Sequence, residues 1–131
     1  MANTNTLPES GLIALIAHDG KKQAMAEFVQ RYADKLAPTA LVATSTTGGV
    51  IEKATPLTVH KMLSGPLGGD LQIGALIAEG RVKAVIFLRD PLEPHPHEPD
   101  ISALMKVCDT HNIPLATNIA TADMILDTIL A

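Results

Sequence analysis

Short runs of apolar residues alternate with longer stretches of helical periodicity along this chain of 131 residues. The clearest runs cover 12–17, 40–43 and 84–88, and a weaker strand is expected within 57–63. Continuous apolar runs of this length are typical of strands buried on both faces, as in parallel sheets. The alternation therefore predicts a Rossmann-like, three-layer α/β/α sandwich with a mostly parallel sheet of about five strands. We expect residues 1–131 to form a single domain of this kind.

Helices and one further short strand are expected between and after these runs. In order along the chain they are a helix over 21–36, a short helix through Ile51, a helix over 71–77, a helix through Leu104, a strand near 114–116 and a last helix from Thr121. Asp100 is the expected N-cap of the helix through Leu104, because an aspartate oxygen can accept a hydrogen bond from the first backbone N–H groups.

Composition excludes several classes of protein. The net charge of −4 and the lack of a basic run argue against a nucleic-acid-binding surface. Cys108 is the only cysteine, so there is neither a disulfide framework nor a thiolate metal site. No apolar run approaches the ~18 residues of a membrane-spanning helix, and residues 1–10 lack the pattern of a signal peptide. We therefore expect a cytoplasmic protein that binds neither nucleic acid nor membrane.

Polar clusters follow the expected strands, at the point where each strand ends. They cover residues 18–19, 44–48, 64–70 and 90–100. In an open parallel sheet the ligand binds in the crevice beyond the carboxyl ends of the strands, so these clusters are expected to meet at one edge. Their placement predicts a single active site there.

The third cluster, Ser64-Gly65-Pro66-Leu67-Gly68-Gly69-Asp70, is a glycine-rich turn that ends in one carboxylate. Glycines let backbone N–H groups approach a ligand closely, and the following helix would offer its N-terminus to an anion. The alternative is an ordinary tight strand-to-helix connection in which Asp70 is a capping acid of the first turn.

The first two clusters suit a phosphate. Lys22 supplies a compact positive charge near a helix start, with His18 four residues before it. Hydroxyl groups gather at another expected helix start, on Thr44, Ser45, Thr46 and Thr47. The order G-x-x-x-x-G-K-[ST] of a P-loop is absent, so we interpret these residues as a different phosphate cradle.

The fourth cluster is a proline-rich loop with titratable groups. Zinc binding by His95 and His97 with nearby acids is one interpretation, although the spacing does not favour it. The interpretation that we prefer is proton abstraction beside a carbonyl group, which needs a carboxylate base and a neutral imidazole. Asp70 would be the base, and His97 would polarise the substrate oxygens and move protons.

Together these motifs resemble the methylglyoxal synthase family over about residues 12–123. The matching segments are Ala17-His18-Asp19 with Lys22, Ala43-Thr44-Ser45-Thr46-Thr47-Gly48, Ser64-Gly65-Pro66-Leu67-Gly68-Gly69-Asp70, Asp90-Pro91-Leu92 continuing to Pro96-His97-Glu98-Pro99-Asp100, and, more weakly, Ala116-Thr117-Asn118 with Ala120-Thr121-Ala122. The resemblance implies a cofactor-free lyase that converts dihydroxyacetone phosphate to methylglyoxal and inorganic phosphate. It also implies a homohexamer that phosphate inhibits.

The resemblance further implies roles for individual residues. Asp70 matches the catalytic base and His97 the histidine at the substrate oxygens, while Asp19, Asp90 and Asp100 match supporting acids. The residues that match phosphate and substrate binders are His18, Lys22, Thr44, Ser45, Thr46, Thr47, Ser64, Gly65 and His97.

The sequence departs from the family pattern at two places, and two other functions are alternatives to the lyase. Ser45 stands where many members have glycine, and the chain ends at Ala131, whereas longer members carry a tail with a basic residue implicated in phosphate sensing. Whether phosphate regulation is cooperative is therefore left open. The alternative functions are a regulatory module of the same fold that binds a phosphate or sugar phosphate, and a sugar-phosphate isomerase.

Overall fold

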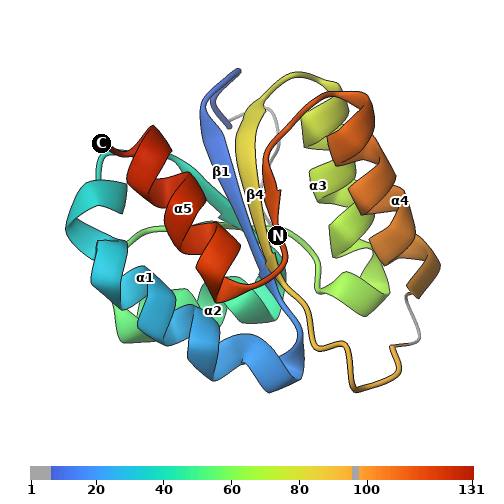
Figure 1. Cartoon of the computed structure of the whole chain (residues 1–131), viewed down its shortest axis with the longest axis horizontal. Helices are drawn as coiled ribbons and strands as arrows, with labels where there is room; N and C mark the ends of the chain where they lie inside the picture. Colours follow the sequence, from blue (N-terminus) through green and yellow to red (C-terminus); the bar gives the residue numbers. More distant parts are fainter. Residues whose placement is uncertain (1–6, 96–97) are drawn as a thin grey trace.

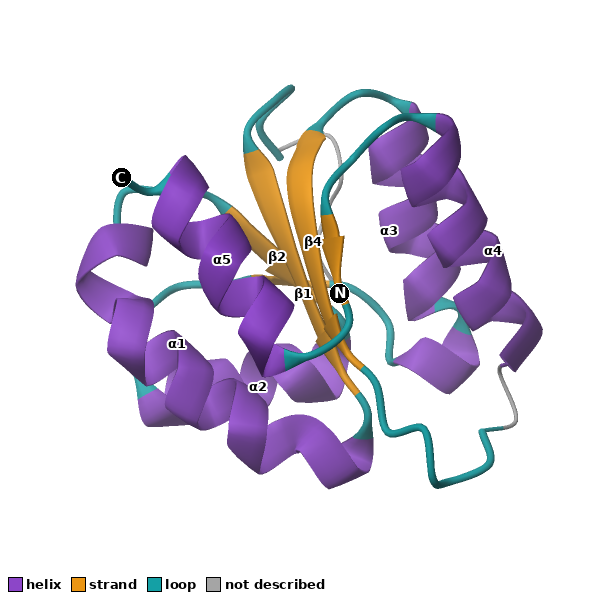
Figure 2. Cartoon of the chain, in the orientation of Figure 1, coloured by secondary structure: helices purple, strands orange, loops and turns teal. Residues whose placement is uncertain are grey.

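The computed structural model describes residues 7–95 and 98–131, which form a parallel sheet between two layers of helices (Figure 1, Figure 2). The strands are β1 (Leu12–Ala17), β2 (Leu41–Ala43), β3 (His60–Lys61), β4 (Val82–Leu88) and β5 (Leu115–Ala116). The α-helices are α1 (Lys22–Leu36), α2 (Ser45–Ala54), α3 (Gly69–Ala78), α4 (Glu98–Thr110) and α5 (Ile119–Ile129). Two 3-10 turns, η2 (Asp19–Lys21) and η3 (Gly65–Leu67), precede α1 and α3. This confirms the predicted α/β/α sandwich; that residues 1–131 are a single domain stays a prediction.

The strand order is β3-β2-β1-β4-β5, so the chain begins in the middle of the sheet and is wound outward in both directions. β1 pairs in parallel with β2 from Ile13 to Leu15 and with β4 along its whole length, ending with Ala17 opposite Leu88. The direction of winding reverses between β1 and β4. In such a sheet the ligand crevice lies at that reversal, beyond the carboxyl ends of the two strands.

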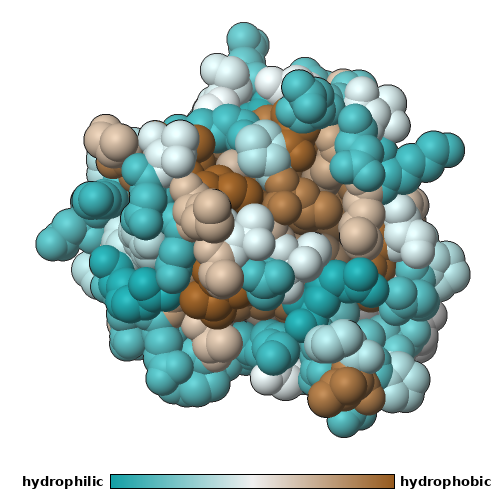
Figure 3. All heavy atoms as spheres, in the orientation of Figure 1, coloured by the Kyte–Doolittle hydropathy of each residue, from teal (hydrophilic) through white to brown (hydrophobic). Residues whose placement is uncertain are grey.

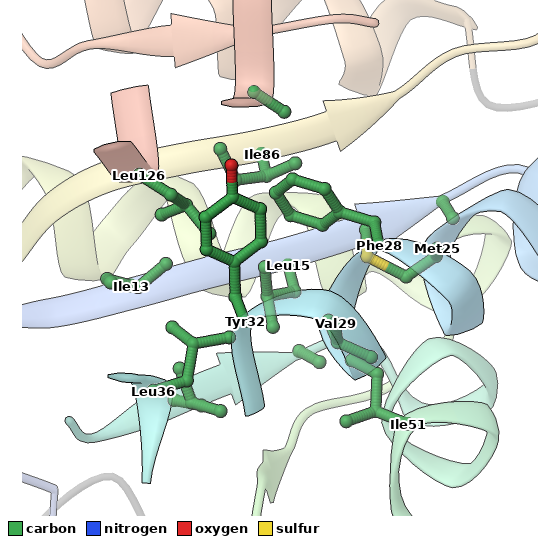
Figure 4. Close-up of a cluster of buried hydrophobic side chains, with 14 of the residues drawn as sticks. Ile13, Leu15, Met25, Phe28, Val29, Tyr32, Leu36, Ile51, Ile86 and Leu126 are labelled. Carbon is green, nitrogen blue, oxygen red and sulfur yellow. The ribbon is translucent and has the colours of Figure 1, made fainter. Parts of the chain in front are cut away.

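Each face of the sheet carries its own hydrophobic core. α1, α2 and α5 cover one face, and α3 and α4 cover the other (Figure 1). In β1, Ile13 and Leu15 belong to the first core, which Phe28 and Tyr32 of α1 complete (Figure 4), whereas Leu12 and Ile16 belong to the second. All residues of β1 are buried, which explains why its sequence does not alternate between apolar and polar residues.

Three details differ from the expectations. Only His60 and Lys61 of the weaker strand candidate over 57–63 pair as a strand, next to β2. α4 begins at Glu98, so Asp100 lies in its first turn and is not its N-cap. α5 begins at Ile119 instead of Thr121, because the Asn118 side chain is the N-cap and accepts the Thr121 N–H at 3.0 Å.

The outer surface is largely hydrophilic in the view of Figure 3, with hydrophobic side chains gathered in the middle of this face, between the two helical layers. Within the described ranges, none of the helices combines the length and apolar character required to cross a bilayer.

Candidate active site

A cleft of about 590 Å³ opens at the carboxyl end of the sheet, where the winding direction reverses. It is lined from all four predicted polar clusters. The predicted site residues that line it are His18, Asp19, Lys22, Thr44, Thr46, Gly65, Asp70 and Asp90. Segments that are far apart in the sequence therefore converge on one cavity, as their position after successive strands predicts.

Asp70 lies in the first turn of α3, is fully buried, and lines this cleft. The glycines before it are required by the turn. Gly68 has a φ of +102°, and a Cβ on Gly69 would lie 1.9 Å from the carbonyl oxygen of Leu63. Gly65 lines the cleft, whereas Gly68 and Gly69 serve the turn geometry that brings the Asp70 carboxyl group into it.

Lys22, in the first turn of α1, is the cation among the described residues that line the cleft. Its side chain is 17% exposed, its ammonium group donates to the carbonyl oxygen of Ala17, and Asp19 Oδ1 lies 3.4 Å away. Burial lowers the pKa of Lys22 from its ordinary value, while the charge and hydrogen bond of Asp19 oppose this shift. The Asp19 side chain itself is exposed to solvent.

The N-terminus of α2 borders the cleft through Thr44 and Thr46. Thr47 is not among the described lining residues, because its side chain is buried. Its hydroxyl oxygen accepts the Ala17 N–H at 3.2 Å and the Thr44 hydroxyl at 3.2 Å. Thr47 therefore links the end of β1 to the start of α2. Neither Ser45 nor Ser64 is among the described lining residues, so their roles as binders stay predictions.

His18 follows β1, and its ring is held on several sides. Nδ1 of His18 accepts the backbone N–H of Asp90 at 2.9 Å. The ring of His95 stacks on it with centroids 3.6 Å apart and planes at 25°, and the Phe87 ring lies edge-on at 5.1 Å. Asp90 packs so closely on Gly20 that a Cβ there would lie 2.3 Å from Asp90 Oδ2.

The structure does not test the predicted catalytic role of two residues. His97 lies outside the described residues, so its role stays a prediction. Asp100 is in the first turn of α4 and is not among the described residues that line the cleft. Glu93 and Pro94 also line the cleft; they belong to the predicted cluster over 90–100 but were not singled out there as site residues.

The described residues contain no group of three or more His, Cys, Asp or Glu side chains placed to hold a metal ion. Because His97 is outside these residues, the expectation that no metal is needed stays a prediction.

Comparisons with known proteins agree with this architecture. The family model described as "MGS-like domain" matches residues 24–117. Methylglyoxal synthase of Ralstonia nicotianae is 59% identical over 120 residues, covering 92% of this chain and 89% of that protein. Methylglyoxal synthase of Thermus thermophilus is 58% identical over 114 residues, covering 87% of this chain and 90% of that protein. The crystal structure of methylglyoxal synthase from Elizabethkingia anophelis superimposes with a TM-score of 0.83 at 47% identity, covering 92% of this chain and 79% of that one.

Proposed function

The chain belongs to the methylglyoxal synthase family, and from this premise we propose that it converts dihydroxyacetone phosphate to methylglyoxal and inorganic phosphate, with Asp70 as the base. The observation that supports this assignment best is that one cleft holds a buried carboxyl group, Asp70, together with Lys22 and the N-terminus of α2. A base and an anion site in one cavity are what proton abstraction from a phosphorylated ketone needs.

In the proposed first step, the Asp70 carboxylate takes a proton from the hydroxymethyl carbon of dihydroxyacetone phosphate. The electron pair of that C–H bond passes to the carbonyl oxygen, and an enediolate forms. Lys22 and the N–H groups at the start of α2 hold the phosphate during this step. Asp70 lies in the first turn of α3, directly after the tight turn at Gly69, so the base is carried on a rigid element.

In the second step, the enediolate expels the phosphate group. The electron pair of the C–O bond leaves with inorganic phosphate, and the resulting enol takes up a proton at the former phosphate-bearing carbon to give the methyl group of methylglyoxal. No redox partner is required, since the atoms of the substrate equal those of the two products. His97, outside the described residues, is proposed as the group that moves protons between the substrate oxygens, with Asp19 and Asp100 as supporting acids.

His18 is proposed as a neutral hydrogen-bond donor to the substrate. Its Nδ1 accepts the Asp90 N–H, so the ring proton is carried by Nε2. A neutral imidazole can donate to a developing oxyanion without adding a full charge.

Elimination and isomerisation start from the same enediolate, and they differ in the angle between the C–O bond to phosphate and the enediolate plane. The test is to incubate the protein with dihydroxyacetone phosphate and to measure methylglyoxal and free phosphate together. Equal amounts of both products are expected. An aldehyde phosphate without free phosphate would instead identify an isomerase, and binding without turnover would identify a regulatory module.

We also propose, from the family resemblance, that inorganic phosphate inhibits the enzyme by occupying the same Lys22 and α2 site. A homohexameric state, a cytoplasmic location and independence from cofactors are proposed on the same ground.

A further inference from the structure

His95 lines the cleft but has no role in the proposed reaction. Its ring stacks on His18 with the centroids 3.6 Å apart, and its Nε2 lies 3.2 Å from the carbonyl oxygen of Asp90. Asp90 in turn donates its N–H to Nδ1 of His18. These three residues form a closed group, which we call the His18–Asp90–His95 cluster.

We propose that His95 is a positioning residue that holds the imidazole of His18 in the orientation in which Nδ1 meets the Asp90 N–H, and thereby in one tautomer. Only the expected effect on kcat/KM rests on the proposed function. The orientation and tautomer of the His18 ring can be observed without turnover.

The hydrogen bonds of Asp90 determine where both rings carry their protons. A backbone N–H can only donate, so Nδ1 of His18 is an acceptor and Nε2 carries the proton. A carbonyl oxygen can only accept, so Nε2 of His95 is the donor in its contact with Asp90. One peptide segment therefore accepts from one histidine and donates to the other.

Stacking by His95 restrains the tilt of the His18 ring, which the hydrogen bond to Nδ1 leaves free. A single bond at Nδ1 lets the ring of His18 tilt around that bond, whereas a ring packed against its face and the edge contact of Phe87 at 5.1 Å oppose such a tilt. His18 is 5% exposed, so its ring is enclosed by these neighbours. The orientation of Nε2–H thus depends on His95.

Three substitutions separate the two contacts of His95. His95→Phe keeps an aromatic face but loses the hydrogen bond to Asp90, His95→Gln keeps an amide donor but loses the ring, and His95→Ala loses both. The matched control is Leu92→Ala, in the same loop, since the Leu92 side chain is 88% exposed.

The first measurement is the ¹⁵N NMR signature of the His18 ring, assigned by its loss in His18→Gln. In the wild type and in Leu92→Ala we expect Nδ1 to be an unprotonated acceptor and Nε2 to be protonated. In His95→Ala we expect the His18 ring to tilt away from the Asp90 N–H, so that this bond no longer fixes the tautomer and the two tautomers average, with partial recovery in His95→Phe. An unchanged His18 signature in a folded His95→Ala protein would overturn the proposal.

The second measurement is a double-mutant cycle for kcat/KM with dihydroxyacetone phosphate. His95→Ala is expected to lower kcat/KM by about 2- to 10-fold, the range of one aromatic contact, and to have little further effect when His18 is already Gln. Additive losses would show that His95 acts independently of His18 and would overturn the proposal. If the wild type forms no methylglyoxal, the proposed function fails, and the NMR measurement still decides the role of His95.

Discussion

At the scale of single residues, the proposed reaction gives different tasks to two groups, Asp70 as the base and Lys22 as the cation. Both line one cleft, but they lie on different elements, α3 and α1. They can therefore be changed separately.

Asp70→Asn should abolish proton abstraction while leaving phosphate binding intact. The amide retains the size of the carboxyl group but cannot act as a base, so the exchange of the substrate proton with solvent deuterium and the release of phosphate should fall together, by about 10²–10⁴-fold. Phosphate affinity should stay the same or rise, because a negative charge has left the cleft. Normal deuterium exchange in this variant would transfer the role of base to another carboxylate, such as Asp19.

Lys22→Ala should raise the Kd for inorganic phosphate by roughly 10- to 100-fold, since a hydrogen bond to a charged group contributes about 1.5–3 kcal/mol. Calorimetry measures this directly. Lys53→Ala is the matched control, because Lys53 is exposed in the last turn of α2. Equal affinities in the two variants would contradict the assigned phosphate site.

The pH dependence of phosphate binding should report Lys22 as well. Burial lowers the pKa of Lys22, so the ammonium charge, which is present below this pKa, is lost as the pH rises through it, earlier than for an exposed lysine. We expect affinity to decline on the alkaline side, and Lys22→Arg to remove this decline, because a guanidinium stays charged. A decline that persists unchanged in Lys22→Arg would assign it to another group.

Which residues line the cleft was largely predictable, because each lies in or next to a polar cluster that follows a strand, and the carboxyl ends of parallel strands share an edge. Asp70, Lys22, His18 and Thr44 were found in this way. The inward turn of the Thr47 hydroxyl toward Ala17 was not predictable, since it depends on how closely α2 approaches β1. The stacking of His95 on His18 depends in the same way on the path of a loop.

At the scale of elements, strands buried on both faces were the easiest to predict. β1 and β4 have apolar neighbours on both sides, and their sequences are apolar throughout except for the exposed Lys83 near the start of β4. The strand expected over 57–63 is present but shorter than predicted, because Leu57, Val59 and Met62 are buried by packing while only two residues join the ladder with β2. Burial and strand pairing leave the same apolar signal in a sequence.

The contact between α1 and α5 gives a prediction about stability. The Tyr32 hydroxyl lies 2.9 Å from Asp127 Oδ1 and 3.2 Å from Asp123 Oδ1, and Arg31 pairs with Asp123 at 2.9 Å. Tyr32→Phe should lower the free energy of unfolding by about 0.5–1.5 kcal/mol, measured by urea denaturation. A variant as stable as the wild type would show that this cluster contributes no net stability.

The same hydroxyl group should make stability depend on pH in the alkaline range. Burial, followed by the hydrogen bonds to Asp127 and Asp123, raises the pKa of Tyr32 from 10.0 to about 12. The unfolded chain loses this proton first, so the contribution is fully present below about pH 10 and is lost progressively as the pH rises toward 12. The difference in unfolding free energy between wild type and Tyr32→Phe should shrink over that interval. A constant difference would contradict the assignment of the pKa shift to these contacts.

At the scale of the whole molecule, the prediction concerns assembly. Leu67 is 70% exposed and Leu71 is 51% exposed, and they lie in η3 and the first turn of α3, next to Pro66 at the cleft. Large side chains in this position gain burial when a second copy covers them, at about 25 cal/mol for each Å² of apolar surface removed from water. The homohexamer proposed from the family resemblance would provide such a cover.

Sedimentation velocity at micromolar concentration should therefore give a hexamer for the wild type. Leu71→Lys should shift the distribution toward smaller species, because a charged side chain in a buried contact must be desolvated without a partner. Met124→Lys is the control, since Met124 is 70% exposed but lies on α5, on the other helical layer. A monomeric wild type would refute the assembly itself. A hexamer that tolerates Leu71→Lys but dissociates in Met124→Lys would instead place the contact on the α5 side, away from the cleft.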